Sequence, residues 1–285
     1  MTILSRVLTA AAATAVIATA GIAHADDKKW TTVTIATEGA FKPYNFTKPD
    51  GTLDGYEIEL TKYLCAHMKV ECKVVVQNFD GMIPGLNAGK FDAIISGMSA
   101  TAKREEVIAF SDSYGSTGQA FATSKESDLA GLPEKGQVFS LASDEAGAAA
   151  EIEKIKPALQ GKTIGVQTAS TAAAFVDKYL KGVVEVREYK TTEEHDLDLK
   201  AGRVDLVMAS MAYLTTASQK PGNEDMTTTG PRFQGGFLGR GSSVGLRKDD
   251  TALKALFNEA IASAKADGTI KTLSEKWFGF DVTPK

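Results

Sequence analysis

The chain has 285 residues, of which 43% are hydrophobic and 24% are charged, and its formal net charge at pH 7 is −4. This length and composition are typical of a globular protein with one large domain or two of ordinary size. The acidic balance argues against a nucleic-acid-binding protein and against attachment to an anionic membrane surface.

The first 25 residues have the features of a secretory signal peptide. Arg6 provides a positive charge, an alanine-rich apolar run extends from Val7 to Ile22, and Ala23-His24-Ala25 has the form of a cleavage site. The run is short for a membrane anchor, and polar residues follow it at once. We therefore expect a periplasmic protein that is cleaved after Ala25. No cysteine near the cut offers a site for lipid attachment.

Apolar patterns then predict an alternation of strands and helices. In the first half, we expect strands at 32–36 and 73–76 and around Ile94 and Phe121, and helices at 56–68, 82–88 and 101–108. In the second half, we expect strands at 162–167, 183–189 and 204–209, and helices at 172–179, 195–201, 251–264 and 268–277. Between them, residues 125–160 have no clear pattern apart from a helical stretch at 146–155.

Two cysteines, Cys65 and Cys72, lie seven positions apart, where a helix is expected to end and a strand to begin. Because an exported protein meets an oxidising compartment, we expect this pair to form a disulfide. Two buried free thiols are the alternative. Metal binding is less favoured, because His67 is the only further ligand nearby and structural zinc requires four.

Arg104 lies in the first turn of a predicted helix, where a cation is mildly unfavourable unless an anion is present. Free backbone N–H groups together with a guanidinium could bind an anion there. Alternatively, Arg104 is a solvated surface residue that is balanced by Glu105 and Glu106.

Two segments of the chain resemble each other: residues 88–95 and residues 201–208. Each contains the end of a helix, a glycine, a basic residue and a buried strand, which indicates that a βαβ-type lobe is built twice. Chance similarity between two ordinary turns is the alternative. Because ligands of open α/β sheets bind beyond the carboxyl ends of the strands, we expect one cleft lined by Glu38, 96–99, 167–171 and Ser210.

The sequence offers no catalytic set. Outside the signal peptide, the histidines are His67 and His195, and neither has the spacing of a metal motif. Nucleophile elbows and phosphate-binding loops of the Walker type are absent from the sequence. We therefore expect no enzyme, no cofactor and no metal, although paired carboxylates cannot be judged by counting.

Several of these features together resemble the periplasmic solute-binding proteins of polar amino-acid ABC importers, notably the lysine/arginine/ornithine- and histidine-binding proteins. The resemblance is carried by the signal peptide, the repeat, the cysteine pair, Ile94–Ser99 with Lys103-Arg104, and the tail from Arg247 to Phe280. Other segments resemble the opine-binding branch, whose members take nopaline and octopine: Ala36–Gly39, Gly230-Pro231 with Gly235-Gly236, the insertion at 125–160 and Lys276-Trp277-Phe278.

The resemblance implies an α/β fold of the type II periplasmic binding proteins, in which two Rossmann-like lobes are joined by two hinge strands. Lobe 1 would contain residues 26–117 and 236–285, and lobe 2 would contain residues 118–235. The chain would cross between the lobes near 116–118 and near 233–239. The implied partner is the membrane permease of an ABC importer, and the protein would be a monomer.

The resemblance also implies roles for individual residues. Arg104 would bind the α-carboxylate of the ligand, Glu38 would bind a distal cation such as a guanidinium, and Phe41 and Phe79 would enclose the aliphatic stem. For both phenylalanines, ordinary core packing is the alternative. Further hydrogen bonds would come from the two turns and strand ends that face the cleft, namely Ser96, Gly97, Met98, Ser99, Gln167, Ser170, Thr171 and Ser210.

Ser210 departs from the pattern of the amino-acid binders, which usually have an aspartate there to pair with the α-ammonium. A buried primary ammonium without a carboxylate would be poorly compensated. An opine instead has a substituted amine and a second carboxylate, which an aspartate would repel. The sequence thus favours an arginine-derived opine of the octopine or nopaline type. The alternative ligands are arginine, lysine, ornithine and histidine.

Two other classes share this fold. A sensor module would normally be joined to a membrane segment or a catalytic domain, and we expect neither here. An enzyme such as a dehydratase would place an acid and a proton-transfer partner in the cleft, and Glu38 alone does not supply such a pair.

Overall fold

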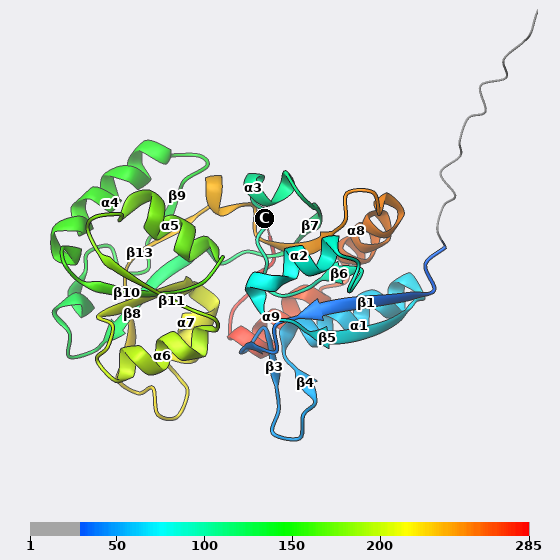
Figure 1. Ribbon diagram of the computed structural model, residues 1–285, viewed down its shortest axis with the longest axis horizontal. Coiled ribbons are helices and arrows are strands. Elements are labelled where there is room, and N and C mark those ends of the chain that lie inside the picture. The colour runs from blue at the N-terminus through cyan, green and yellow to red at the C-terminus, as the bar shows by residue number, and fades with distance from the viewer. Residues whose placement is uncertain (1–28, 285) are drawn as a thin grey trace, which may run out of the picture.

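The computed structural model describes residues 29–284, which form two α/β lobes side by side (Figure 1). The predicted signal peptide, with its cleavage site, lies outside these residues. Each lobe is built around its own sheet, and a small three-stranded sheet projects from lobe 1. Within the described residues, no helix is both long enough and apolar enough to cross a bilayer.

Lobe 1 contains a five-stranded sheet in the order β5-β1-β6-β14-β7. Its strands are β1 (Thr32–Thr37), β5 (Glu71–Val76), β6 (Ala93–Ile94), β7 (Ala109–Gly115) and β14 (Ser242–Leu246). The projecting sheet consists of β2 (Ala40–Phe41), β3 (Asn45–Thr47) and β4 (Leu53–Asp54). The helices are α1 (Tyr56–Met68), α2 (Met82–Asn87), α3 (Ala102–Glu105), α8 (Thr251–Ala266) and α9 (Thr269–Phe278), with a 3-10 turn η1 (Phe79–Gly81).

Lobe 2 contains a six-stranded sheet in the order β11-β10-β12-β8-β13-β9. Its strands are β8 (Gln119–Ser124), β9 (Val138–Ser140), β10 (Thr163–Gln167), β11 (Glu185–Tyr189), β12 (Leu206–Ser210) and β13 (Met226–Gln234). The helices are α4 (Glu145–Leu159), α5 (Thr171–Tyr179), α6 (Thr192–Lys200) and α7 (Met211–Ala217), with 3-10 turns η2 (Asp128–Gly131) and η3 (Gly236–Leu238).

The two sheets repeat one parallel arrangement. In lobe 1, β1 lies between β5 and β6, with Ile35 opposite Val74 and Ala93. In lobe 2, β10 lies between β11 and β12 in the same way. The resemblance between residues 88–95 and 201–208 therefore reflects two equivalent units, each of which ends in a strand, β6 or β12, that pairs in parallel with the first strand of that unit, β1 or β10.

Apolar side chains of the strands and helices form a core in each lobe. The predicted stripe of α1 is buried against lobe 1, where it meets Phe257 and Ile261 of α8. In lobe 2, Ile164 and Val166 of β10 pack with Phe175 of α5. The sheets are thus held rigidly, so the strand ends that face the cleft have defined positions.

The predicted cysteine pair is confirmed, because Cys65 and Cys72 form a disulfide between the last turns of α1 and the start of β5. The helix predicted at 101–108 is wrong in length, since α3 covers only Ala102–Glu105. It ends early because Ile108 is fully buried and leads directly into β7.

The chain passes between the two sheets at 116–118, which connects β7 to β8, and at 235–241, which connects β13 to β14. The second passage begins two residues later than the predicted 233–239, because Phe233 and Gln234 still pair with β9. The two passages touch: Gly241 has φ 116°, and a Cβ added there would lie 3.2 Å from Cβ of Ser116.

Candidate functional site

A pocket lies between the lobes, beyond the carboxyl ends of β1, β6, β10 and β12. We call it the arginine pocket, and its cavity has a volume of about 50 Å³. It is lined by every predicted ligand residue except Met98, and also by residues that were not predicted: Gln119, Ala172, Thr192, Met208 and Ala209.

Met98 is the predicted ligand residue that the structure places elsewhere. Its side chain is 1% exposed and packs in an apolar cluster with Ile94 and Phe110. Its carbonyl oxygen accepts a hydrogen bond from the Ser243 amide of β14 at 3.0 Å. Met98 therefore anchors the turn to lobe 1, while Ser96, Gly97 and Ser99 on either side of it face the pocket.

Arg104 reaches into the pocket from α3. Its Nη1 donates to the carbonyl oxygen of Ser99 and its Nη2 to that of Ala169, both at 2.9 Å, and its guanidinium lies over the Phe79 ring at 5.5 Å. Burial lowers the pKa of Arg104 to about 10, so it remains charged near neutral pH. A guanidinium has five N–H donors, so these two bonds leave others for a carboxylate. The alternative of a solvated arginine balanced by its neighbours does not hold, because Arg240 pairs with Glu105 instead.

Glu38 follows β1, also lines the pocket and is 4% exposed. Its backbone amide donates to Ser96 Oγ at 3.0 Å, and its Oε1 accepts from Gln167 Nε2 at 2.7 Å. Burial raises its pKa to about 8, and nearby acids including Glu57 add to the rise while the Gln167 hydrogen bond opposes it. A cation beside Glu38 would restore the charged form.

Both predicted phenylalanines line the pocket, but they do not offer two ring faces to a ligand. Phe41 stacks nearly parallel on Tyr44, with 4.7 Å between centroids, and on Tyr213, with 5.1 Å. Because these rings cover its faces, Phe41 presents its edge, which abuts Gly97. An aliphatic stem would therefore lie between that edge and Phe79.

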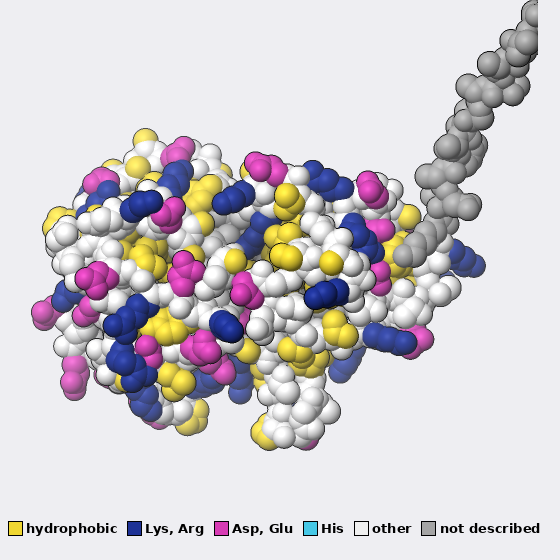
Figure 2. Space-filling view, in the orientation of Figure 1, with side chains coloured by type: hydrophobic (Ala, Val, Ile, Leu, Met, Phe, Trp, Pro, Cys, Tyr) yellow, Lys and Arg dark blue, Asp and Glu magenta, His cyan; other side chains and the backbone are white. Residues whose placement is uncertain are grey.

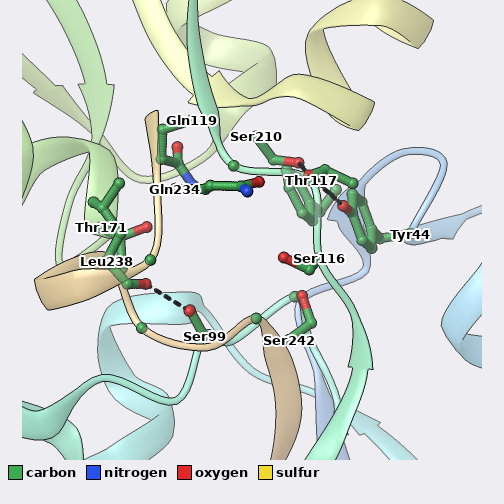
Figure 3. A pocket seen from close by; sticks show the side chains of 16 residues that line it. Tyr44, Ser99, Ser116, Thr117, Gln119, Thr171, Ser210, Gln234, Leu238 and Ser242 are labelled. Carbon is green, nitrogen blue, oxygen red and sulfur yellow. Dashed lines mark hydrogen bonds between the residues drawn. The ribbon is translucent and has the colours of Figure 1, made fainter. Parts of the chain in front are cut away.

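A second pocket, with a cavity volume of about 50 Å³, continues from the first towards the passages between the lobes. We call it the hinge pocket. Hydroxyl and amide side chains of Ser116, Gln119, Gln234 and Ser242 point into it (Figure 3). The two pockets share Phe41, Gly97, Ser99, Gln119, Thr171 and Ser210, so they are two ends of one cleft.

Ser210 lies where the two pockets join. Its Oγ is 3.0 Å from Tyr44 Oη and 2.9 Å from Thr117 Oγ1, so three hydroxyls form one cluster. Burial raises the pKa of Tyr44 to about 12, so its hydroxyl stays protonated. Tyr44 and Thr117 were missed in the sequence, although the predicted crossing at 116–118 pointed to Thr117.

Direct contacts join the lobes across the cleft. Gln167 of lobe 2 bonds to Glu38, the Ala169 carbonyl bonds to Arg104, and Ser210 bonds to Tyr44. The cleft is therefore closed. Among the described residues that line the two pockets, Glu38 is the only acid and Arg104 the only base.

This geometry is that of a closed two-lobed binding cleft, and comparison with known proteins agrees. Residues 33–280 match the family model of bacterial extracellular solute-binding proteins, family 3. The chain belongs to this family. Its structural neighbours are type II periplasmic binding proteins, so the predicted fold is confirmed.

Several relatives of this family 3 protein are close along nearly the whole chain. The octopine-binding periplasmic protein of Rhizobium meliloti is 46% identical over 288 residues, covering 95% of this chain and 97% of that protein. The L-arginine-binding protein of Pseudomonas aeruginosa is 33% identical over 253 residues, covering 88% and 89%. The predicted resemblance to the polar amino-acid and opine binders is therefore confirmed.

Solved structures give the same result. An ancestral arginine-binding protein bound to arginine has a TM-score of 0.72 and 31% identity, covering 87% of this chain and 98% of that one. A periplasmic His/Glu/Gln/Arg/opine family-binding protein from Silicibacter pomeroyi, in complex with lysine, has a TM-score of 0.69 and 32% identity, covering 88% and 99%.

Proposed function

We propose that this protein captures an arginine-derived opine of the octopine or nopaline type in its interlobe cleft and delivers it to an ABC importer. Arg104 binds the α-carboxylate, and Glu38 binds the guanidinium at the other end of the arginine pocket. The N-carboxyalkyl arm that distinguishes an opine from arginine extends towards the hinge pocket. The octopine-binding relative supports this ligand class.

The observation that carries the proposal is the neutral lining around Ser210. Ser210 is surrounded by the hydroxyls of Tyr44 and Thr117, and the described lining of the hinge pocket has no carboxylate. A primary α-ammonium would be buried there without a counter-charge, which is costly. An opine carries its own second carboxylate beside the amine, and hydroxyl and amide groups can donate hydrogen bonds to that anion.

The proposal is tested by calorimetric titration of the purified protein with octopine, nopaline and arginine. We expect at least one opine to bind about tenfold or more tightly than arginine, because an uncompensated buried ammonium costs more than 1 kcal/mol. Arg104→Ala should abolish most binding of every ligand, whereas Lys103→Ala, which changes the adjacent exposed cation, should not. Arginine binding far tighter than both opines would favour the alternative, a basic amino-acid-binding protein.

Transport, not chemistry, is the proposed role of the cleft. The relatives named above are solute-binding proteins. The lining has a single acid and no nucleophile–base pair among its described residues. Acidic and basic side chains are interspersed on the face shown in Figure 2, which fits a protein that binds no nucleic acid. Mass spectrometry of the ligand released from the protein should recover it unchanged. Mass spectrometry of the mature protein should show that it begins at Asp26.

A further inference from the structure

A carboxylate outside the pocket lining connects the segments that build lobe 1's side of the cleft. Glu57, the second residue of α1, is 0% exposed. Its Oε2 accepts from Asn45 Nδ2 at 2.6 Å, and its Oε1 accepts from the Gly97 amide at 2.6 Å and from the Tyr114 hydroxyl. Three donors therefore converge on one buried side chain.

Each donor belongs to a different segment of lobe 1. Asn45, from β3, also accepts a hydrogen bond from the Gly39 amide at 2.7 Å and so holds the turn next to Glu38. Gly97 is the centre of the turn between Ser96 and Ser99. Tyr114 is in β7, two residues before the first passage between the lobes.

The hydrogen bonds have a fixed direction. The Gly39 amide can only donate, so Asn45 must present its Oδ1 to Gly39 and its Nδ2 to Glu57. The Gly97 amide can also only donate. Glu57 must therefore accept at both oxygens, and a glutamine, which has one oxygen and one amide nitrogen, cannot do so.

We propose that Glu57 is a positioning residue for ligand binding, which through Asn45 and Gly97 holds the Glu38 and Ser96–Ser99 turns at the spacing that the ligand requires. Glu57 lines neither pocket, so its hydrogen bonds reach the cleft only through these residues, although its charge also raises the pKa of Glu38. This inference rests on the proposed function for its ligand, but the hydrogen-bond network itself can be tested without one.

The test is a pair of substitutions with opposite effects. Glu57→Gln places an amide group against either Asn45 Nδ2 or the Gly97 amide, so one buried donor loses its acceptor, and we expect ligand affinity to fall about tenfold. Adding Asn45→Asp keeps one acceptor oxygen for the Gly39 amide. Its second oxygen can accept from the amide group that Glu57→Gln introduces. The double variant should therefore bind within about threefold of the wild-type affinity, since every donor is again paired.

Glu59→Gln is the matched control, because Glu59 lies on the same helix and bonds only to Lys276 at the surface. We expect its affinity to equal that of the wild type. Wild-type affinity in Glu57→Gln, or a double variant that binds no better than Glu57→Gln, would overturn the positioning role. If Glu57→Gln fails to fold but the double variant folds, that result would support the positioning role.

Hydrogen exchange provides a readout that needs no ligand. In the wild type, the amides of Gly39 and Gly97 should exchange slowly, because both are bonded to buried acceptors. Rapid exchange of either amide would refute the network even if no variant folds. If no opine or amino acid binds the wild type while both amides are protected, the proposed function fails and the network stands.

Discussion

Among the described residues that line the cleft, Glu38 is the acid and Arg104 the base, and burial shifts the pKa of each. Arg104 keeps its charge despite a lowered pKa, whereas Glu38 has its pKa raised to about 8 and is largely protonated at neutral pH. The charge on Glu38 therefore depends on the ligand. A guanidinium next to it would stabilise the carboxylate and release a proton.

This linkage predicts that affinity for a guanidinium ligand rises with pH. Below pH 8, binding must remove a proton from Glu38, so affinity should increase by up to about tenfold per pH unit between pH 6 and pH 8 and then level off. Calorimetry in buffers of different ionisation enthalpy should detect the released proton. Glu38→Gln should bind more weakly and without this dependence; a flat profile in the wild type would contradict the assignment.

At the scale of elements, the turn that leads into α1 holds the loop that carries Tyr44, which is a residue of the cleft. The amides of Tyr56 and Glu57, at the start of the helix, donate to the carbonyl oxygens of Pro43 and Tyr44 at 2.9 and 2.8 Å. These contacts require Gly55, which has φ 126° and whose added Cβ would lie 2.6 Å from the Tyr44 carbonyl oxygen. The helix and the aromatic loop are thereby joined without a side-chain cap.

Gly55→Ala should destabilise the protein by roughly 3 kcal/mol or more, because it combines a backbone conformation reserved for glycine with a clash against main-chain atoms. It should also weaken ligand binding, since Tyr44 must move. Gly51→Ala is the control: Gly51 has φ 83° but no atom within 4 Å of an added Cβ, so only about 1 kcal/mol is expected. Urea unfolding measures both, and equal costs would contradict the role of the contact.

At the scale of the molecule, closure depends on a few polar contacts that link the lobes. Tyr44, on the lobe 1 side, bonds to Ser210 of lobe 2 and lies 3.5 Å from Thr117 in the first passage. Ser210 and Thr117 also bond to each other at 2.9 Å. Removing the Tyr44 hydroxyl would therefore weaken the link between the lobes without leaving either partner unpaired.

We expect Tyr44→Phe to raise the ligand dissociation rate about fivefold while the association rate changes little, because one neutral hydrogen bond of the closed form is worth about 1 kcal/mol. Stopped-flow measurements can separate the two rates. Tyr63→Phe is the control, since Tyr63 bonds to Ser263 and Asp267 within lobe 1. A dissociation rate that changes equally in both variants would show that the Tyr44 contact does not stabilise closure.

The sequence by itself determined which segments end at the cleft. Two equivalent units were marked by the alternation in 32–36 and 162–167 and by the glycines after α2 and α6. Because ligands of open α/β sheets bind beyond the carboxyl ends of the strands, Glu38, Gln167 and Ser210 were then expected at one edge. These signals are local, because they depend on residues a few positions apart. They can therefore be recognised without knowledge of the fold.

Only the tertiary structure decided how those segments meet. Met98 points into the core, Phe41 is covered by Tyr213 from the other lobe, and Glu57 bonds to Tyr114, which lies 57 positions away. The contact between Tyr44 and Ser210 spans 166 positions. No pattern along the chain encodes such contacts, because they depend on the packing and relative placement of the two lobes.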